Sequence, residues 1–120
     1  MVDDNEANRR MNKSRLVLDG FTVAEAANGI EAISRLNESP PDIVVLDLYM
    51  DRMDGFKVLE YMKGDERFKA IPVIVLSARS APAEKARVMS FGADVFLIKM
   101  TTSPMKLSEQ VKAVLAKRHV

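Results

Sequence analysis

Five side chains in this sequence have the chemistry to hold a divalent cation and to accept a phosphoryl group. Asp3 and Asp4 are adjacent, and Asp47, Ser77 and Lys99 each close a short apolar run. Carboxylates that lie within a few ångströms of one another repel, so a cation must keep them ionised, and Mg²⁺ suits an all-oxygen site. An aspartate beside Mg²⁺ can attack a phosphoryl group and form an acyl phosphate. An amine and a hydroxyl, with nearby backbone N–H groups, would then hold the other phosphoryl oxygens.

Each of these residues also has an ordinary structural explanation when it is taken alone. Asp3 and Asp4 could cap a helix, and the other three could be polar strand ends or a solvated amine. The phosphoryl-transfer interpretation therefore depends on all five side chains meeting at one place in the fold.

The composition excludes several other kinds of site. The chain has no Cys and a single His, His119, so disulfides, thiolate metal sites and His-based triads are ruled out. No apolar run approaches the ~20 residues of a membrane span, and no signal peptide opens the chain. With 120 residues, 48% of them apolar and 29% charged, the sequence predicts one globular domain over residues 1–120, which we expect in the cytoplasm.

Strands and helices are expected to alternate along the chain. Short β-branched runs predict strands at residues 42–47, 72–77 and 95–99, with a weaker one at 21–27. Helical spacing and caps predict helices at residues 5–18, 30–38, 56–64 and 82–91, and a last one that starts at Ser103 and Pro104. This alternation predicts a parallel sheet with helices on both faces. Ligands of such sheets bind beyond the carboxyl ends of the strands, where the five candidate side chains would converge.

These residues lie in motifs that resemble those of the response-regulator receiver domain of two-component signalling. That domain has the same fold as the chemotaxis regulator. The resemblance covers essentially all 120 residues, in the order and at the spacings of the family. Its motifs are Asp3-Asp4-Asn5, Val-Val-Leu-Asp47, Met50-x-x-Met53-Asp54-Gly55, Leu-Ser77-Ala78, Gly92-Ala93-Asp94 and Leu-Ile-Lys99. The resemblance implies a doubly wound, flavodoxin-like α/β fold with five helices and a parallel five-stranded sheet in the order 2-1-3-4-5.

The resemblance also implies a function and a set of site residues. Asp47 matches the phosphoacceptor, which receives its phosphoryl group from a histidine kinase or a phosphotransfer protein. Mg²⁺ is the implied cofactor, and its protein ligands would be Asp47, Asp4, Asp3 through water, and the backbone carbonyl of Tyr49. The phosphate-binding and switch positions match Ser77, Ala78, Lys99 and the aromatic Phe96.

In the family, the fourth helix, fifth strand and fifth helix form the output face. Here that face covers roughly residues 83–118, within a half of the chain (residues 61–120) that has 11 Lys and Arg against 5 Asp and Glu. Such a module promotes only its own phosphorylation and dephosphorylation, so we do not expect an enzyme acting on other substrates. The basic residues are spread out without interleaved aromatics, which disfavours direct binding of nucleic acid.

The largest departure from the family pattern is the first strand, for which this sequence offers only the stub Met1-Val2. A shortened central strand leaves its two neighbours with unpaired backbone groups. Either the domain tolerates the stub, or a second protomer supplies the pairing in a homodimer or a strand-swapped oligomer. A receiver-fold scaffold or dimerisation module that no longer signals by phosphorylation is therefore the alternative function.

Two further departures concern the helices and Lys99. Asn12 stands where the family has an apolar residue facing the sheet, although periodicity also permits an inward face of Ala7, Met11, Ser14 and Leu18. Lys99 is followed by Met100, where the family has a proline after a cis bond. We expect a trans bond, since a cis bond before another residue costs about 2.5–4 kcal/mol, and this leaves the direction of Lys99 open.

Overall fold

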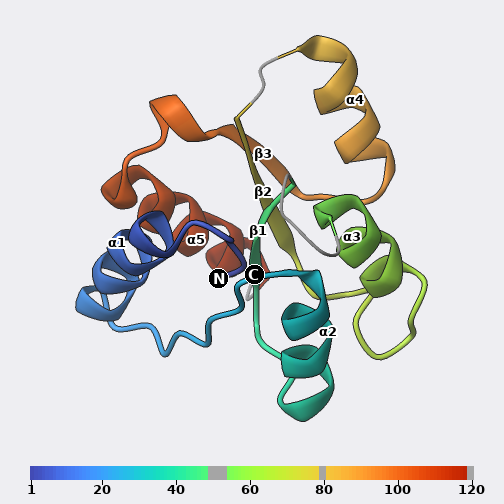
Figure 1. Ribbon diagram of the computed structural model, residues 1–120, viewed down its shortest axis with the longest axis horizontal. Coiled ribbons are helices and arrows are strands. Elements are labelled where there is room, and N and C mark those ends of the chain that lie inside the picture. The colour runs from blue at the N-terminus through green and yellow to red at the C-terminus, as the bar shows by residue number, and fades with distance from the viewer. Residues whose placement is uncertain (49–53, 79–80, 119–120) are drawn as a thin grey trace.

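The structure is a computed structural model that describes residues 1–48, 54–78 and 81–118 (Figure 1). Helices and strands alternate through most of it, as the sequence predicts. The elements are α1 (Glu6–Leu18), α2 (Gly29–Glu38), β1 (Val44–Asp47), α3 (Gly55–Lys63), β2 (Val73–Ser77), α4 (Pro82–Ser90), β3 (Val95–Ile98), a 3₁₀ turn (Lys99–Thr101) and α5 (Pro104–Arg118).

The three strands form a parallel sheet in the order β1-β2-β3, with Val44 opposite Val73 and Ile74 opposite Val95. Helices α1 and α5 cover one face, and α2, α3 and α4 lie on the other (Figure 1). Every residue of β1 and β2 is buried, because each strand has helices on both sides. The predicted doubly wound α/β architecture is thus confirmed.

The stub at the start of the chain takes the place of a strand beside β1. Val2 forms single parallel bridges to both Ala26 and Leu46. The expected strand at residues 21–27 forms a bridge only at Ala26, because the neighbouring segment in the sheet is the two-residue stub. The described residues therefore contain three strands and two bridges, and the five-strand order remains a prediction.

Local hydrogen bonds set the helix ends that frame the sheet. The side chains of Asn5, Asn28 and Asp54 accept from backbone N–H groups in the first turns of α1, α2 and α3. Ser103 does the same for α5, as predicted, through Lys106 N at 3.2 Å. Because Asn5 is the cap of α1, the carboxylate of Asp4 is not used for that purpose.

The first helix does not rotate to the alternative inward face. Leu16 is its buried residue, Asn12 is half-buried, and Met11 and Leu18 are exposed. The alternative prediction, an inward face that includes Met11 and Leu18, is therefore wrong, since Leu16 packs with the side chains of α5 instead. No helix in the described ranges is long and apolar enough to cross a membrane.

Candidate phosphoryl and metal site

Three carboxylates meet at the carboxyl edge of the sheet. Asp47 is the last residue of β1, and Asp3 and Asp4 directly follow the bridging residue Val2. One oxygen from each carboxylate lies within 4.8 Å of the others. Asp3 and Asp47 are buried whereas Asp4 is exposed, so the cluster opens to solvent on one side. The sequence prediction that these acids converge is confirmed in the geometry.

Asp3 has a buried oxygen that no hydrogen bond satisfies. Its Oδ1 accepts from the backbone N–H of Asn5 at 2.9 Å. Its Oδ2 receives no hydrogen bond from the described residues, although Lys99 Nζ lies at an ion-pair distance of 3.1 Å. The Lys99 ammonium offsets part of the cost of burying this charged oxygen, and a bound metal cation would offset more of it. The donor set is all oxygen and rich in charge, and it therefore fits Mg²⁺.

Lys99 links the two buried carboxylates. Its Nζ lies 3.1 Å from Oδ2 of Asp47, to which it donates a hydrogen bond, and at the same distance from Asp3. Burial opposes the charge of Lys99, but the attraction of Asp47 and Asp3 outweighs it and raises the pKa of Lys99 above its ordinary value. The bond between Lys99 and Met100 is trans, as predicted, and the side chain still reaches the site.

Ser77 ends β2 beside these charges, and its side chain is buried. Its hydroxyl donates to Oε1 of Glu84 at 2.9 Å, which ties the strand to the first turn of α4. Sequence reasoning did not find Glu84. An acid in a first helical turn is common, and nothing in the sequence fixes how the turn is placed against the strand end.

The remaining predicted residues have varied positions. Ala78 is exposed directly after β2, and Phe96 is a half-buried residue of β3 that packs against the core on the α2–α4 side. Tyr49, the predicted backbone ligand, lies outside the described residues, as do Met50 and Met53 of the same motif.

Arg9 is a second contributor that the sequence did not reveal. Its Nη1 donates to the backbone carbonyl of Asp3 at 2.8 Å, while its Nε contacts Glu25 at 3.2 Å. Lys13 holds the same glutamate at 3.0 Å. The contact with Arg9 joins Asp3 to α1, so Asp3 is held through its backbone carbonyl as well as through its side chain.

Gly55 allows α3 to begin directly against the end of β1. A Cβ atom at this position would collide with the carbonyl oxygen of Asp47 and would lie 2.7 Å from the Cα of Leu48. Both neighbours are backbone, so neither can move aside without displacing Asp47.

We expect Gly55→Ala to lower the free energy of unfolding by about 1–3 kcal/mol, the usual cost of overpacking. Urea unfolding followed by circular dichroism measures this change. Gly64→Ala is the matched control, because its Cβ would lie 3.3 Å from the carbonyl oxygen of Glu60, a contact that needs a shift of only a few tenths of an ångström. Equal losses in the two variants would contradict the argument.

Comparison with known proteins agrees with this geometry. A family model of the response regulator receiver domain matches residues 1–112. The chain belongs to this family. It is similar over 96% of its length to the polar-differentiation response regulator DivK of Brucella anthropi, at 26% identity and 93% coverage of that protein. It is 32% identical over 115 residues to the probable transcriptional regulator ycf27 of Guillardia theta. The receiver domain spans less than half the length of the ycf27 relatives, at 44% and 46%.

Solved structures share the fold. The signal receiver domain of a signal transduction histidine kinase from Syntrophus aciditrophicus aligns with a TM-score of 0.87 and 31% identity, over 97% of this chain and 87% of that one. The chemotaxis response regulator CheY4 of Vibrio cholerae aligns with a TM-score of 0.87 and 27% identity, over 94% and 93%. The receiver domain described here is thus a member of a two-component signalling family with a flavodoxin-like fold.

Proposed function

We propose that this receiver domain is the phosphoacceptor of a phosphorelay, in which Asp47 receives a phosphoryl group from a phosphohistidine on a histidine kinase or phosphotransfer protein. The observation that carries the proposal is the convergence of Asp47 with Asp3, Asp4 and Lys99 at one edge of the sheet. The domain acts on no other substrate in this proposal. It promotes only its own phosphorylation and dephosphorylation.

The transfer would use the charges of this site in a defined way. A carboxylate oxygen of Asp47 attacks phosphorus, the bond from phosphorus to the imidazole nitrogen breaks, and the ring leaves with its electron pair. Bound Mg²⁺, held by Asp3, Asp4 and Asp47, would supply positive charge to neutralise a phosphoryl oxygen. Lys99 already lies against Asp47, and its ammonium can turn to a second phosphoryl oxygen because it remains protonated.

The contact between Ser77 and Glu84 would relay this event to α4. For the Ser77 hydroxyl to donate to the new phosphoryl group, it must stop donating to Glu84. The first turn of α4 then loses this hydrogen bond to β2. Helix α4 borders the face that we propose as the output surface, together with β3 and α5.

Neutralising the acceptor of this hydrogen bond should make phosphorylation easier. A hydrogen bond to a charged acceptor is stronger than one to a neutral acceptor by about 1 kcal/mol, so Glu84→Gln should accelerate phosphoryl addition roughly fivefold. The rate is measured by mass spectrometry with a small acyl-phosphate donor. Glu109→Gln, an exposed change on α5, is the control. A Glu84→Gln variant that is phosphorylated at the wild-type rate or slower would contradict the relay.

The proposed output surface has a shallow hollow of about 470 Å³ that runs across β3 between α4 and α5. Lys85 and Lys106 line it with Phe96. Two other basic residues of this half have partners elsewhere: Arg87 stacks on the ring of Phe56 at 4.1 Å, and Lys112 lies 3.7 Å from Asp19. Lys85 and Lys106 therefore offer positive charge for an acidic partner at this hollow, beside the single acid Glu109.

The direct test is addition of a phosphoryl group to the purified domain. With a small acyl-phosphate donor and Mg²⁺, the intact mass should rise by one phosphoryl group, and peptide mapping should place it on Asp47. Chelation of the metal should prevent the addition. No mass gain, or a label on another residue, would overturn the proposal and favour a scaffold that does not signal by phosphate.

A further inference from the structure

Arg9 of α1 joins the acidic cluster to the rest of the domain through two different acceptors. Its Nη1 donates to the backbone carbonyl of Asp3 at 2.8 Å, and its Nε donates to Oε1 of Glu25 at 3.2 Å. A guanidinium is planar and rigid, so the two acceptors are held in one fixed geometry. The side chain of Arg9 is only 14% exposed, and both contacts are therefore largely shielded from competing water.

The carbonyl that Arg9 holds belongs to the peptide bond between Asp3 and Asp4. The carboxylates of these two residues branch from the backbone on either side of that bond, and both belong to the acidic cluster. Among the described residues, the backbone bonds from this segment to the sheet end at the N–H of Asp3, which donates to Ala26 at 3.1 Å. Beyond that point, the N–H of Asn5 bonds the side chain of Asp3, and Arg9 bonds its carbonyl. The orientation of this peptide therefore depends on Arg9.

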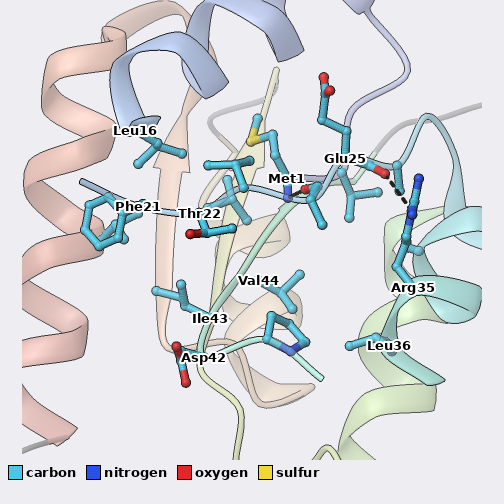
Figure 2. A pocket seen from close by; sticks show the side chains of 18 of the residues that line it. Met1, Leu16, Phe21, Thr22, Glu25, Arg35, Leu36, Asp42, Ile43 and Val44 are labelled. Atoms are coloured by element: carbon cyan, nitrogen blue, oxygen red, sulfur yellow. Dashed lines mark hydrogen bonds between the residues drawn. The ribbon is translucent and has the colours of Figure 1, made fainter. Parts of the chain in front are cut away.

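Glu25 keeps the guanidinium of Arg9 in place. Lys13, one turn further along α1, donates to the other carboxylate oxygen of Glu25 at 3.0 Å, so each oxygen has its own cation. The hydrogen bonds from Lys13 and Arg9 outweigh burial and lower the pKa of Glu25 below its ordinary value, so the carboxylate stays charged near neutral pH. From α2, Arg35 donates to the backbone carbonyl of Glu25 at 3.3 Å, while the carboxylate points away from Arg35 (Figure 2). Residue 25 is thus fixed from two sides.

We propose that Arg9 is a positioning residue for the metal site: by holding the peptide bond between Asp3 and Asp4, it sets how tightly their carboxylates bind Mg²⁺. The inference rests on the proposed function, because it takes Mg²⁺ as the ion of the acidic cluster. The hydrogen bonds of Arg9 go to the carbonyl of Asp3 and to Glu25. Arg9 therefore acts on the ion through the residues that bind it.

The geometry and the charge of Arg9 have opposite effects on the ion. A positive charge beside the site repels a second cation, so removal of the charge by itself would strengthen the binding of Mg²⁺. Loss of an outer partner of the metal ligands weakens a metal site by about 10- to 100-fold, because the ligands lose their orientation. The sign of the change in Mg²⁺ affinity therefore separates the two effects.

An NMR titration of the isotope-labelled domain with Mg²⁺, at a temperature at which every variant is folded, tests the proposal. We expect Arg9→Met to bind Mg²⁺ roughly tenfold more weakly than the wild type. Lys13→Met is the matched control, because Lys13 has the same charge and the same partner, Glu25, but donates no hydrogen bond to Asp3. Lys13→Met should bind Mg²⁺ as tightly as the wild type or more tightly. An equal fall of affinity in both variants would overturn the proposal.

A measurement on the wild type decides the question if Arg9→Met does not fold. Coupling between two contacts is reciprocal, so Mg²⁺ should strengthen the contact between Arg9 and Asp3 by the factor with which that contact strengthens Mg²⁺ binding. Hydrogen exchange at Nη1 of Arg9 should therefore slow roughly tenfold when the ion is added. Exchange at the guanidinium of Arg10, which is exposed on the same helix, should stay the same. Unchanged exchange at Arg9 would overturn the proposal.

The titration also separates this inference from the proposed function. A wild-type domain that binds no Mg²⁺ would overturn both. If the wild type binds Mg²⁺ and Arg9→Met binds it at least as tightly, only the positioning role is overturned, and a lower melting temperature of Arg9→Met in chelator would then assign Arg9 a purely structural role. If Arg9→Met weakens Mg²⁺ binding but the wild type gains no phosphoryl group, the positioning role stands and the proposed function fails.

Discussion

The Asp47→Asn variant should gain no phosphoryl group under conditions in which the wild-type domain is fully modified. Asparagine matches aspartate in shape and can still accept a hydrogen bond from Lys99, so the surroundings of residue 47 are retained. What is lost is the carboxylate oxygen that, in the proposed reaction, attacks phosphorus, and an amide oxygen is a poor nucleophile. Intact-mass measurement after incubation with the donor and Mg²⁺ gives the result directly.

Asp42→Asn is the matched control for this loss. Asp42 is exposed and precedes β1, while Asp47 ends the strand at the opposite edge of the sheet. The two variants remove the same charge from the same segment. We expect Asp42→Asn to be phosphorylated like the wild type. Modification of Asp47→Asn at the wild-type level would assign the phosphoacceptor to a different residue.

Asp3→Asn should greatly reduce the stabilisation of the domain by Mg²⁺. A ligand at about 100 times its dissociation constant stabilises a folded protein by about 2.7 kcal/mol, so the wild type should melt at a higher temperature with Mg²⁺. Asp3→Asn should lose most of this gain, because the buried Oδ2 that lacks a hydrogen bond is no longer an anion. We expect a fall of roughly 10- to 100-fold in Mg²⁺ affinity.

Without Mg²⁺, the same substitution should not destabilise the domain. It removes the repulsion between the buried carboxylates of Asp3 and Asp47, which compensates for the weaker contact with Lys99. Thermal melts with Mg²⁺ and with chelator measure both effects, and Glu66→Gln, an exposed change, is the control. A variant that Mg²⁺ stabilises as much as it does the wild type would contradict the assignment of the metal site.

Much of this fold could be predicted because its strands and helix ends depend on local sequence. The runs that end at Asp47 and Ser77 are apolar throughout, as strands buried on both faces require. The start of α5 at Ser103-Pro104 follows from the capping hydroxyl and the fixed backbone of proline. The convergence of the acids followed in turn, since the carboxyl ends of parallel strands share one edge.

The contacts that sequence reasoning missed depend on the placement of one element against another. Glu84 reaches Ser77, and Arg9 reaches the carbonyl of Asp3, through the register of a helix on a strand end, which no local pattern encodes. The strand expected at residues 21–27 failed for a related reason. A strand needs a partner of matching length, and only Val2 is available to pair with Ala26.

Two of the three acids, Asp3 and Asp4, directly follow the stub that bridges the sheet. Four backbone hydrogen bonds join Val2 and the residues on either side of it to Ala26, Val45 and Asp47. If this segment opens locally, Asp3 and Asp4 leave the cluster together, so opening of the segment and loss of the proposed cation site would be one equilibrium. The apparent cation affinity would then be the intrinsic affinity reduced by the fraction of molecules in which Val2 is paired in the sheet. Cation binding at the proposed site would thus also report how well this segment is folded.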